Sequence, residues 1–144
     1  MAITTSMGTD FKRRLLEAKE NFLLSGGDTY KMPLYTSSAT LSAATDTYSS
    51  TNEHANGSGY TTGGNTLTRI DPAESGTTVY TDFPDTAWST ATITARAAGI
   101  YNDTDASDPW VSAHDFGADK TSTAGTFTVV FPAADASNAI LRLA

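Results

Sequence analysis

The sequence predicts a mainly β fold, an antiparallel β-sandwich or a jelly-roll-like barrel, with one amphipathic helix near the N-terminus. Threonine occurs 25 times in the 144 residues, and its β-branched side chain favours strands. Short runs rich in β-branched and aromatic residues recur from Tyr30 to the C-terminus. Several of these runs alternate apolar and polar residues, which is typical of antiparallel strands with one face on a core.

Residues 9–24 form the predicted helix. Its apolar stripe is spaced at helical intervals and consists of Phe11, Leu15, Ala18 and Phe22, widened by Leu16 and Leu23. Thr9 or Asp10 is the expected N-cap. The run Ser25-Gly26-Gly27 is the expected end of the helix.

Eight strands are expected in the rest of the chain, at residues 29–36, 66–70, 77–83, 90–96, 98–102, 110–116, 125–131 and 139–143. We expect a single domain over residues 1–144, in which an N-terminal segment (1–27) precedes a β body (28–144). Residues 37–65 are rich in Ser, Thr, Asn and Gly. This stretch is long enough to be a functional loop, an extended arm or a poorly ordered excursion.

The charge is acidic and uneven. The net charge of −7 disfavours nucleic acid and anionic membrane as partners. Residues 1–32 hold five basic and four acidic groups, whereas residues 33–144 hold four basic and twelve acidic groups. The absence of cysteine excludes disulfides, thiolate metal sites and cysteine nucleophiles. We expect neither a signal peptide nor a transmembrane helix, because no apolar run approaches the required length.

No catalytic motif is apparent, so we expect a protein that is not an enzyme and has no cofactor. His114 and Asp115 are adjacent in a predicted strand, so their side chains should point to opposite faces. His54 lies in the loop, and two histidines without cysteine make a poor metal site. A nucleophile elbow and a phosphate-binding glycine loop are both missing.

Three weaker patterns remain open. Residues 103–108 place oxygen-bearing side chains at alternate positions, as a calcium loop does, but lack its glycine and its final glutamate. Asp82, Asp85 and Asp115 could serve glycoside hydrolysis only if the fold brought two of them across a cleft. The aromatic candidates for a sugar platform are Tyr48, Tyr60, Trp88 and Trp110. We expect both tryptophans in the core instead.

Seven segments of the sequence carry a resemblance to a known group of proteins: residues 1–7, 11–16, 30–41, 59–64, 91–96, 115–117 and 131–140. Through them it resembles a group of small tailed-bacteriophage proteins encoded mostly among virion genes. The segments span nearly the whole length, although Gly8 stands where the group would have a cysteine. None of them is a catalytic motif, so the resemblance implies a structural role in the virion and transfers no active-site residues.

The expected function is therefore a non-enzymatic virion component, above all a capsid decoration or cement protein. It would form a homo-oligomer in the particle and contact the major capsid protein. A tail, neck or tail-tip protein and a carbohydrate-binding attachment module are the alternatives, and a glycosidase is a more distant one. Contacts with partners are expected in residues 1–32, because their basic excess complements the acidic body. They are also expected in residues 37–65, because this stretch has too little apolar content to form a core and is long for an idle loop. The candidate contact residues are Ile3, Met7, Lys12, Arg13, Arg14, Leu41, Tyr48 and Tyr60.

Overall fold

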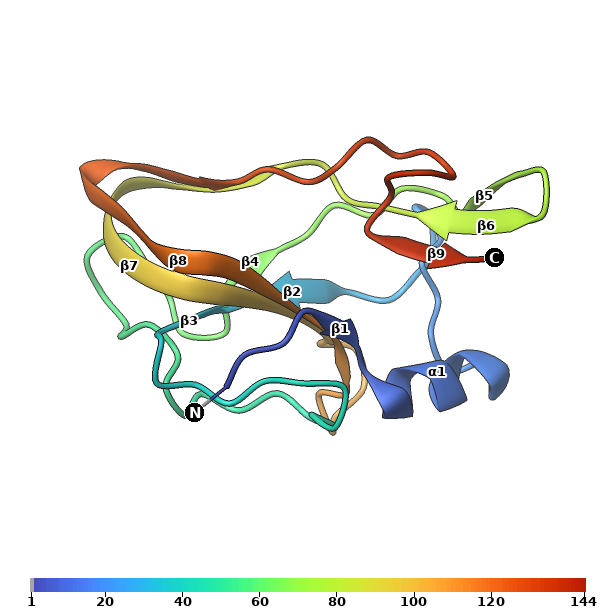
Figure 1. Ribbon diagram of the computed structural model, residues 1–144, viewed down its shortest axis with the longest axis horizontal. Helices are drawn as coiled ribbons and strands as arrows, with labels where there is room; N and C mark the ends of the chain where they lie inside the picture. Colours follow the sequence, from blue (N-terminus) through green and yellow to red (C-terminus); the bar gives the residue numbers. More distant parts are fainter. Residues whose placement is uncertain (1) are drawn as a thin grey trace.

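The computed structural model describes residues 2–144 and confirms the predicted class, with antiparallel sheets and one short N-terminal helix (Figure 1). The elements are β1 (Ser6–Met7), α1 (Thr9–Leu16), β2 (Tyr30–Met32), β3 (Leu34–Tyr35), β4 (Asn65–Thr66), β5 (Ala73–Ser75), β6 (Thr78–Thr81), β7 (Thr86–Asn102), β8 (Trp110–Val129) and β9 (Leu141–Leu143). Within residues 2–144, no helix is both long and apolar enough to cross a membrane.

The strands form two antiparallel sheets of unequal size. The larger has the order β1-β8-β7-β2-β4, and β3 also pairs with β7. The smaller has the order β5-β6-β9. The predicted strand at 77–83 contains β6, and the one at 139–143 contains β9. The predicted strand at 29–36 contains both β2 and β3, and the one at 66–70 overlaps β4 only at Thr66. β1 and β5 were not predicted because they are too short to show a period.

One long, bent hairpin forms the centre of the larger sheet. β7 and β8 pair from Thr86↔Val129 to Tyr101↔Trp110, where four separate strands had been predicted. Register shifts interrupt the pairing at several points, and such irregularities bend a strand. Figure 1 shows the result: the ribbon curls at the left, and its outer half returns over the molecule. One hairpin thus supplies strands to the main sheet and a cover for the core.

Both tryptophans lie in the core, as expected. Trp110 is fully buried and Trp88 is 4% exposed. A Cβ on Gly99 would lie 2.0 Å from Cη2 of Trp110, so the indole ring rests on a strand position where only glycine fits. Gly99 thereby leaves the room that the Trp110 ring occupies beside β7.

The helix is half as long as predicted. α1 ends at Leu16, and Ala18 has a left-handed φ of 56°. Leu16 is 92% exposed and Leu23 is 50% exposed, so neither widens a buried stripe. The helix starts after Gly8 without a side-chain cap, so the predicted N-caps were wrong, as was the predicted end at residues 25–27.

The physical reason for the early end is tertiary packing, which outweighs helix propensity. The chain turns at Ala18 and buries the side chain of Glu20 against Arg14. Phe22 then enters the core from an extended segment, where it stacks on Tyr30 at 4.3 Å between ring centroids. Its ring also meets Phe11 edge-on at 6.0 Å. Phe11 and Phe22 therefore meet in the core, although they do not lie on one helix.

Candidate docking site

The 37–65 stretch is packed against the body and is not a free arm. Leu41 is 5% exposed and Tyr60 is 2% exposed. Tyr48 is half-buried and stacks on Tyr101 at 4.4 Å. Ile3 is half-buried and forms a parallel bridge with Leu41. The burial of Leu41 and Tyr60 removes both from a partner-facing surface, which corrects the expectation placed on them.

A buried carboxylate ties this stretch together. Oε1 of Glu53 accepts hydrogen bonds from the Tyr60 hydroxyl at 2.5 Å and from the Gly63 N–H at 2.7 Å. Oε2 accepts one from the Tyr48 hydroxyl at 2.6 Å. Burial is the main reason that the pKa of Tyr60 is raised above its ordinary value. These residues, Tyr48, Glu53, Tyr60 and Gly63, are called the Glu53 cluster below, and they close the loop internally.

The three basic candidates in α1 differ in their surroundings. Arg14 is buried and pairs with Glu20 at 2.6 Å and with Asp105 at 3.1 Å. Arg13 is exposed and pairs with Asp10 and Glu17, which lie one helical turn before and after it. Lys12 is exposed. Arg14 is therefore an internal anchor, neither solvated nor free to meet an acidic partner.

The acidic turn at 103–108 is engaged by the same anchor. Hydrogen bonds from the backbone and hydroxyl of Ser107, together with Arg14, lower the pKa of Asp105 to about 2. Asp103 pairs with Lys31 at 3.2 Å. In residues 2–144, no group of three or more histidine or acidic side chains is arranged to hold a metal ion.

The catalytic candidates do not gather around a cleft. Nε2 of His114 lies 2.8 Å from the Ser112 hydroxyl, but Ser112 is 2% exposed. Asp115 bonds to Arg96 instead of His114. Asp82 is fully buried, and burial raises its pKa. The Ser112 hydroxyl and the half-buried His114 ring therefore pair within β8, and Asp115 does not complete a triad with them.

His54, the remaining histidine, lies edge-on to Tyr60 at 5.2 Å. Asp85 accepts a hydrogen bond from the Phe131 N–H at 2.8 Å. Tyr60, Trp88 and Trp110 are all buried, so these rings do not present a flat aromatic surface for a sugar.

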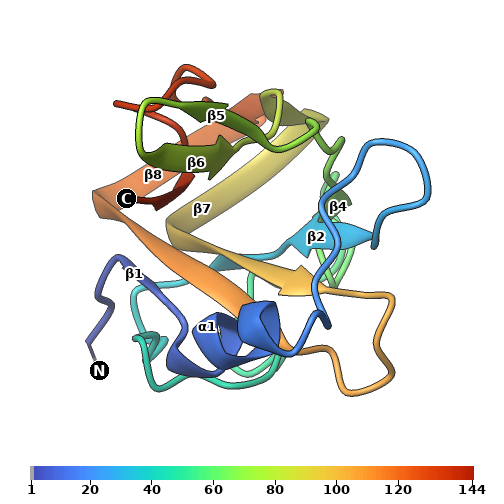
Figure 2. The same ribbon diagram turned by 90° about the vertical axis from the view of Figure 1, so that its right-hand side faces the viewer.

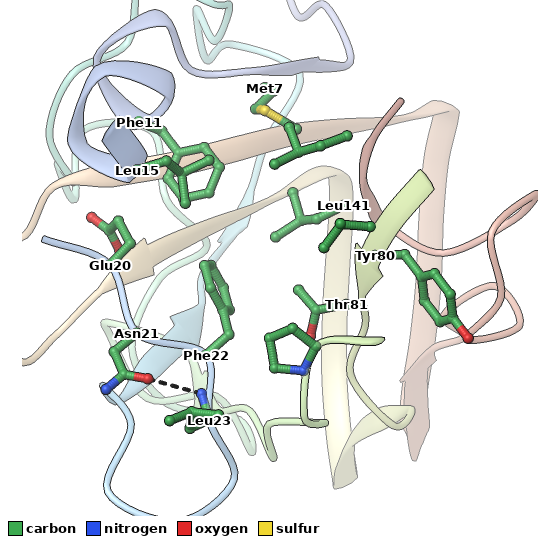
Figure 3. Close-up of a pocket in the computed structure, with 13 residues that line it drawn as sticks. Met7, Phe11, Leu15, Glu20, Asn21, Phe22, Leu23, Tyr80, Thr81 and Leu141 are labelled. Carbon is green, nitrogen blue, oxygen red and sulfur yellow. Dashed lines mark hydrogen bonds between the residues drawn. The ribbon is translucent and has the colours of Figure 1, made fainter. Parts of the chain in front are cut away.

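An apolar groove of about 260 Å³ lies at the other end of the molecule, between α1 and the small sheet. Figure 3 shows Phe11, Leu15 and Phe22 on one wall and Leu141 on the other, with Met7 at one end. We call this the β9 groove. Apolar side chains remain uncovered along it: Leu143 is 51%, Leu23 50% and Val79 43% exposed.

The pairing of β6 with β9 explains why the groove is apolar. Val79 faces Leu143 and Thr81 faces Leu141 across the two strands. Directly paired residues point to the same side of a sheet, so both leucines and Val79 line one face. Met7 is the one residue among the predicted contacts that lines the β9 groove. Strands at 77–83 and 139–143 were predicted from the sequence, but the uncovered face was not.

Comparisons with protein-family models, with curated proteins and with solved structures found no match to this chain.

Proposed function

We propose that this chain is a non-enzymatic structural component of a tailed-phage virion, in which it decorates the capsid by docking on neighbouring proteins. The observation that carries the proposal is the β9 groove. Half-exposed leucine and valine side chains surround an apolar hollow, and this is the chemistry of protein–protein contact. The resemblance to tailed-phage proteins supplies the setting.

The rest of the molecule supports a passive role. Polar side chains that could bind a ligand or react, such as Glu53, Arg14 and Asp105, form hydrogen bonds with other groups of the same chain. Such buried networks rigidify a fold. A rigid domain with one uncovered apolar surface suits a lattice, where many weak contacts at fixed geometry give firm attachment.

The test is the copy number of the chain relative to the major capsid protein in purified particles. A decoration protein is expected at hundreds of copies, in a simple ratio to the capsid protein. A small total that is a multiple of three, five, six or twelve would move the chain to the tail or neck. Absence from particles purified to constant composition would overturn the proposal altogether.

A further inference from the structure

Strand β9 has one open edge. Leu141–Leu143 pairs with β6 and with no other strand of residues 2–144. Among residues 2–144, no backbone hydrogen bond joins these three residues to a segment outside the small sheet. Figure 2, which faces this end of the molecule, shows β9 on the side of the sheet nearest β1 and α1. The unpaired edge therefore faces the gap that the β9 groove occupies.

Two hollows flank that edge, one on each face of the strand. Leu141 and Leu143 line the β9 groove, whereas Ile140, Arg142 and Ala144 line a second hollow of about 530 Å³. This division follows from strand geometry, because successive side chains point to opposite faces. Met7 is the one residue that lines both hollows. It therefore lies across the gap from β9, in line with the open edge.

The arrangement matches the requirements of strand addition. An extended segment that pairs with a sheet edge gains main-chain hydrogen bonds, and its alternate side chains enter hollows on the two faces. The other edge of the small sheet lacks these features. β5 is exposed at all three residues and lines neither hollow. The two edges of one sheet thus differ, and β9 is the edge strand that lines both of these hollows.

The two hollows call for different side chains. Apolar groups line the groove, and its one charged residue, Glu20, is buried against Arg14. The second hollow contains Arg142 as its one charged side chain, next to Thr78, Ala136 and Ile140. Arg142 is exposed, donates a hydrogen bond to the Ser137 carbonyl and contributes to lowering the pKa of Asp135, but it forms no salt bridge within residues 2–144. Charge complementarity therefore favours an acidic side chain on that face.

We propose that the open edge of β9 receives an extended segment of a partner protein in which apolar and acidic side chains alternate. The apolar side chains enter the β9 groove between Leu15 and Leu143, and the acidic ones lie beside Arg142. The inference rests on the proposed function, because it names the surface by which the chain would be held in the particle.

The first experiment measures binding of the full chain to an array of synthetic nine-residue peptides. Each peptide carries Leu, Ile, Val or Phe at alternate positions and Ser at the intervening ones, except for a single intervening position that is Asp, Ser or Lys. We expect the Asp series to bind two- to fivefold more tightly than the Lys series, the range for an exposed charge contact. N-methylation of every second amide should abolish binding in one frame and spare it in the other, because only one set of N–H groups faces β9. Equal binding of both frames, or no binding above background, would overturn the inference.

The second experiment uses matched variants. Leu143→Lys places a charge in the groove and should reduce peptide binding at least tenfold. Leu16→Lys makes the same change at a more exposed leucine that lines neither hollow, and it should bind as the parent chain does. Circular dichroism and the melting temperature check that both variants fold. Unchanged binding by folded Leu143→Lys would contradict the inference.

Particles separate this inference from the proposed function. If the parent chain is abundant in particles and Leu143→Lys is incorporated equally well, the inference fails and the proposed function stands. If the parent chain is absent from particles although it binds alternating peptides through β9, the proposed function fails and the binding edge remains.

Discussion

The 37–65 loop and the small sheet are both built from short or irregular segments, yet one is closed and the other is open. The loop has almost no regular structure, and buried hydrogen bonds to Glu53 hold it in place. The small sheet has regular strands, but it leaves apolar side chains and a strand edge uncovered. Regular secondary structure therefore does not show which part of the surface is free to bind a partner. In the closed region the buried polar groups are hydrogen-bonded within the chain, and in the open region apolar side chains are left exposed.

The largest expected effect concerns the wall of the β9 groove. Phe22→Ala should cost about 3–5 kcal/mol of unfolding free energy, the usual range for deleting a buried phenylalanine. Phe22 is 7% exposed and stacks on Tyr30. Urea denaturation measures the effect, with Leu16→Ala as the control expected to change stability by less than about 0.5 kcal/mol. A loss below 1 kcal/mol for Phe22→Ala would mean that the groove wall is not part of the core.

The next effect concerns the closed region. Glu53→Ala leaves the Tyr60 hydroxyl and the Gly63 N–H without their acceptor, and each unsatisfied buried donor costs about 1–3 kcal/mol. We expect a loss of about 3 kcal/mol in denaturant unfolding. Tyr48→Phe removes one hydroxyl from the same cluster and should cost only about 1 kcal/mol. If Glu53→Ala is no worse than Tyr48→Phe, the carboxylate is not what closes the loop.

The unfolding free energy should also depend on pH, through His114 in β8. Burial lowers the pKa of His114 to about 4 from an ordinary value of 6.5. Below pH 6.5 the unfolded chain takes up a proton that the folded chain refuses, so stability falls as the pH drops toward 4. The full loss is about 3 kcal/mol, at 1.36 kcal/mol per pKa unit.

Unfolding measured between pH 7 and pH 4 checks this effect, and His114→Gln should remove the corresponding slope. Asp82 gives a control of opposite sign. Its pKa is raised by burial, so the folded chain binds that proton more readily and gains stability as the pH falls. An unaltered slope in His114→Gln would place the acid sensitivity elsewhere.

The smallest expected change in stability is at the rim of the open region. Leu143→Ser should alter the unfolding free energy by less than about 0.5 kcal/mol, because the side chain is already 51% exposed. The melting temperature of the variant compared with the parent chain measures it. A loss above 2 kcal/mol would show that the residue holds β9 on β6, and the groove would then be a feature of folding.

The sequence predicted the fold class well because the signal is local. Alternation at 91–95 and 126–129, together with buried Trp88 and Trp110, needs only period-two reasoning. The length of α1 could not be predicted in this way. The pattern Phe11, Leu15, Ala18, Phe22 suits a helix, but Glu20 finds its partners in Arg14, Tyr30 and Asn102 only in the folded chain.

The candidate site was predicted least well, for a similar reason. Low apolar content made 37–65 resemble an uncommitted arm, yet Glu53 and the tyrosines at 48 and 60 close it through contacts that no spacing reveals. The β9 groove arises from segments at 7–23, 72–81 and 141–143 that meet only in three dimensions. Alternation in a strand shows that one face is apolar, and it does not show whether anything covers that face.

The bent β7–β8 hairpin also sets the order in which the chain can fold. Its strands are joined by a turn of only seven residues, 103–109, so pairing can begin there within microseconds and extend outward. β1 must wait, because Ser6 pairs with Ala113, over a hundred residues later. Pairing over this sequence separation carries a large loop-closure entropy cost, and the contacts that offset this cost can form only once β8 is in place. On a ribosome, β1 and α1 would emerge before their partner strand β8, and until β8 forms Met7 and Phe11 would be free for chaperones to bind.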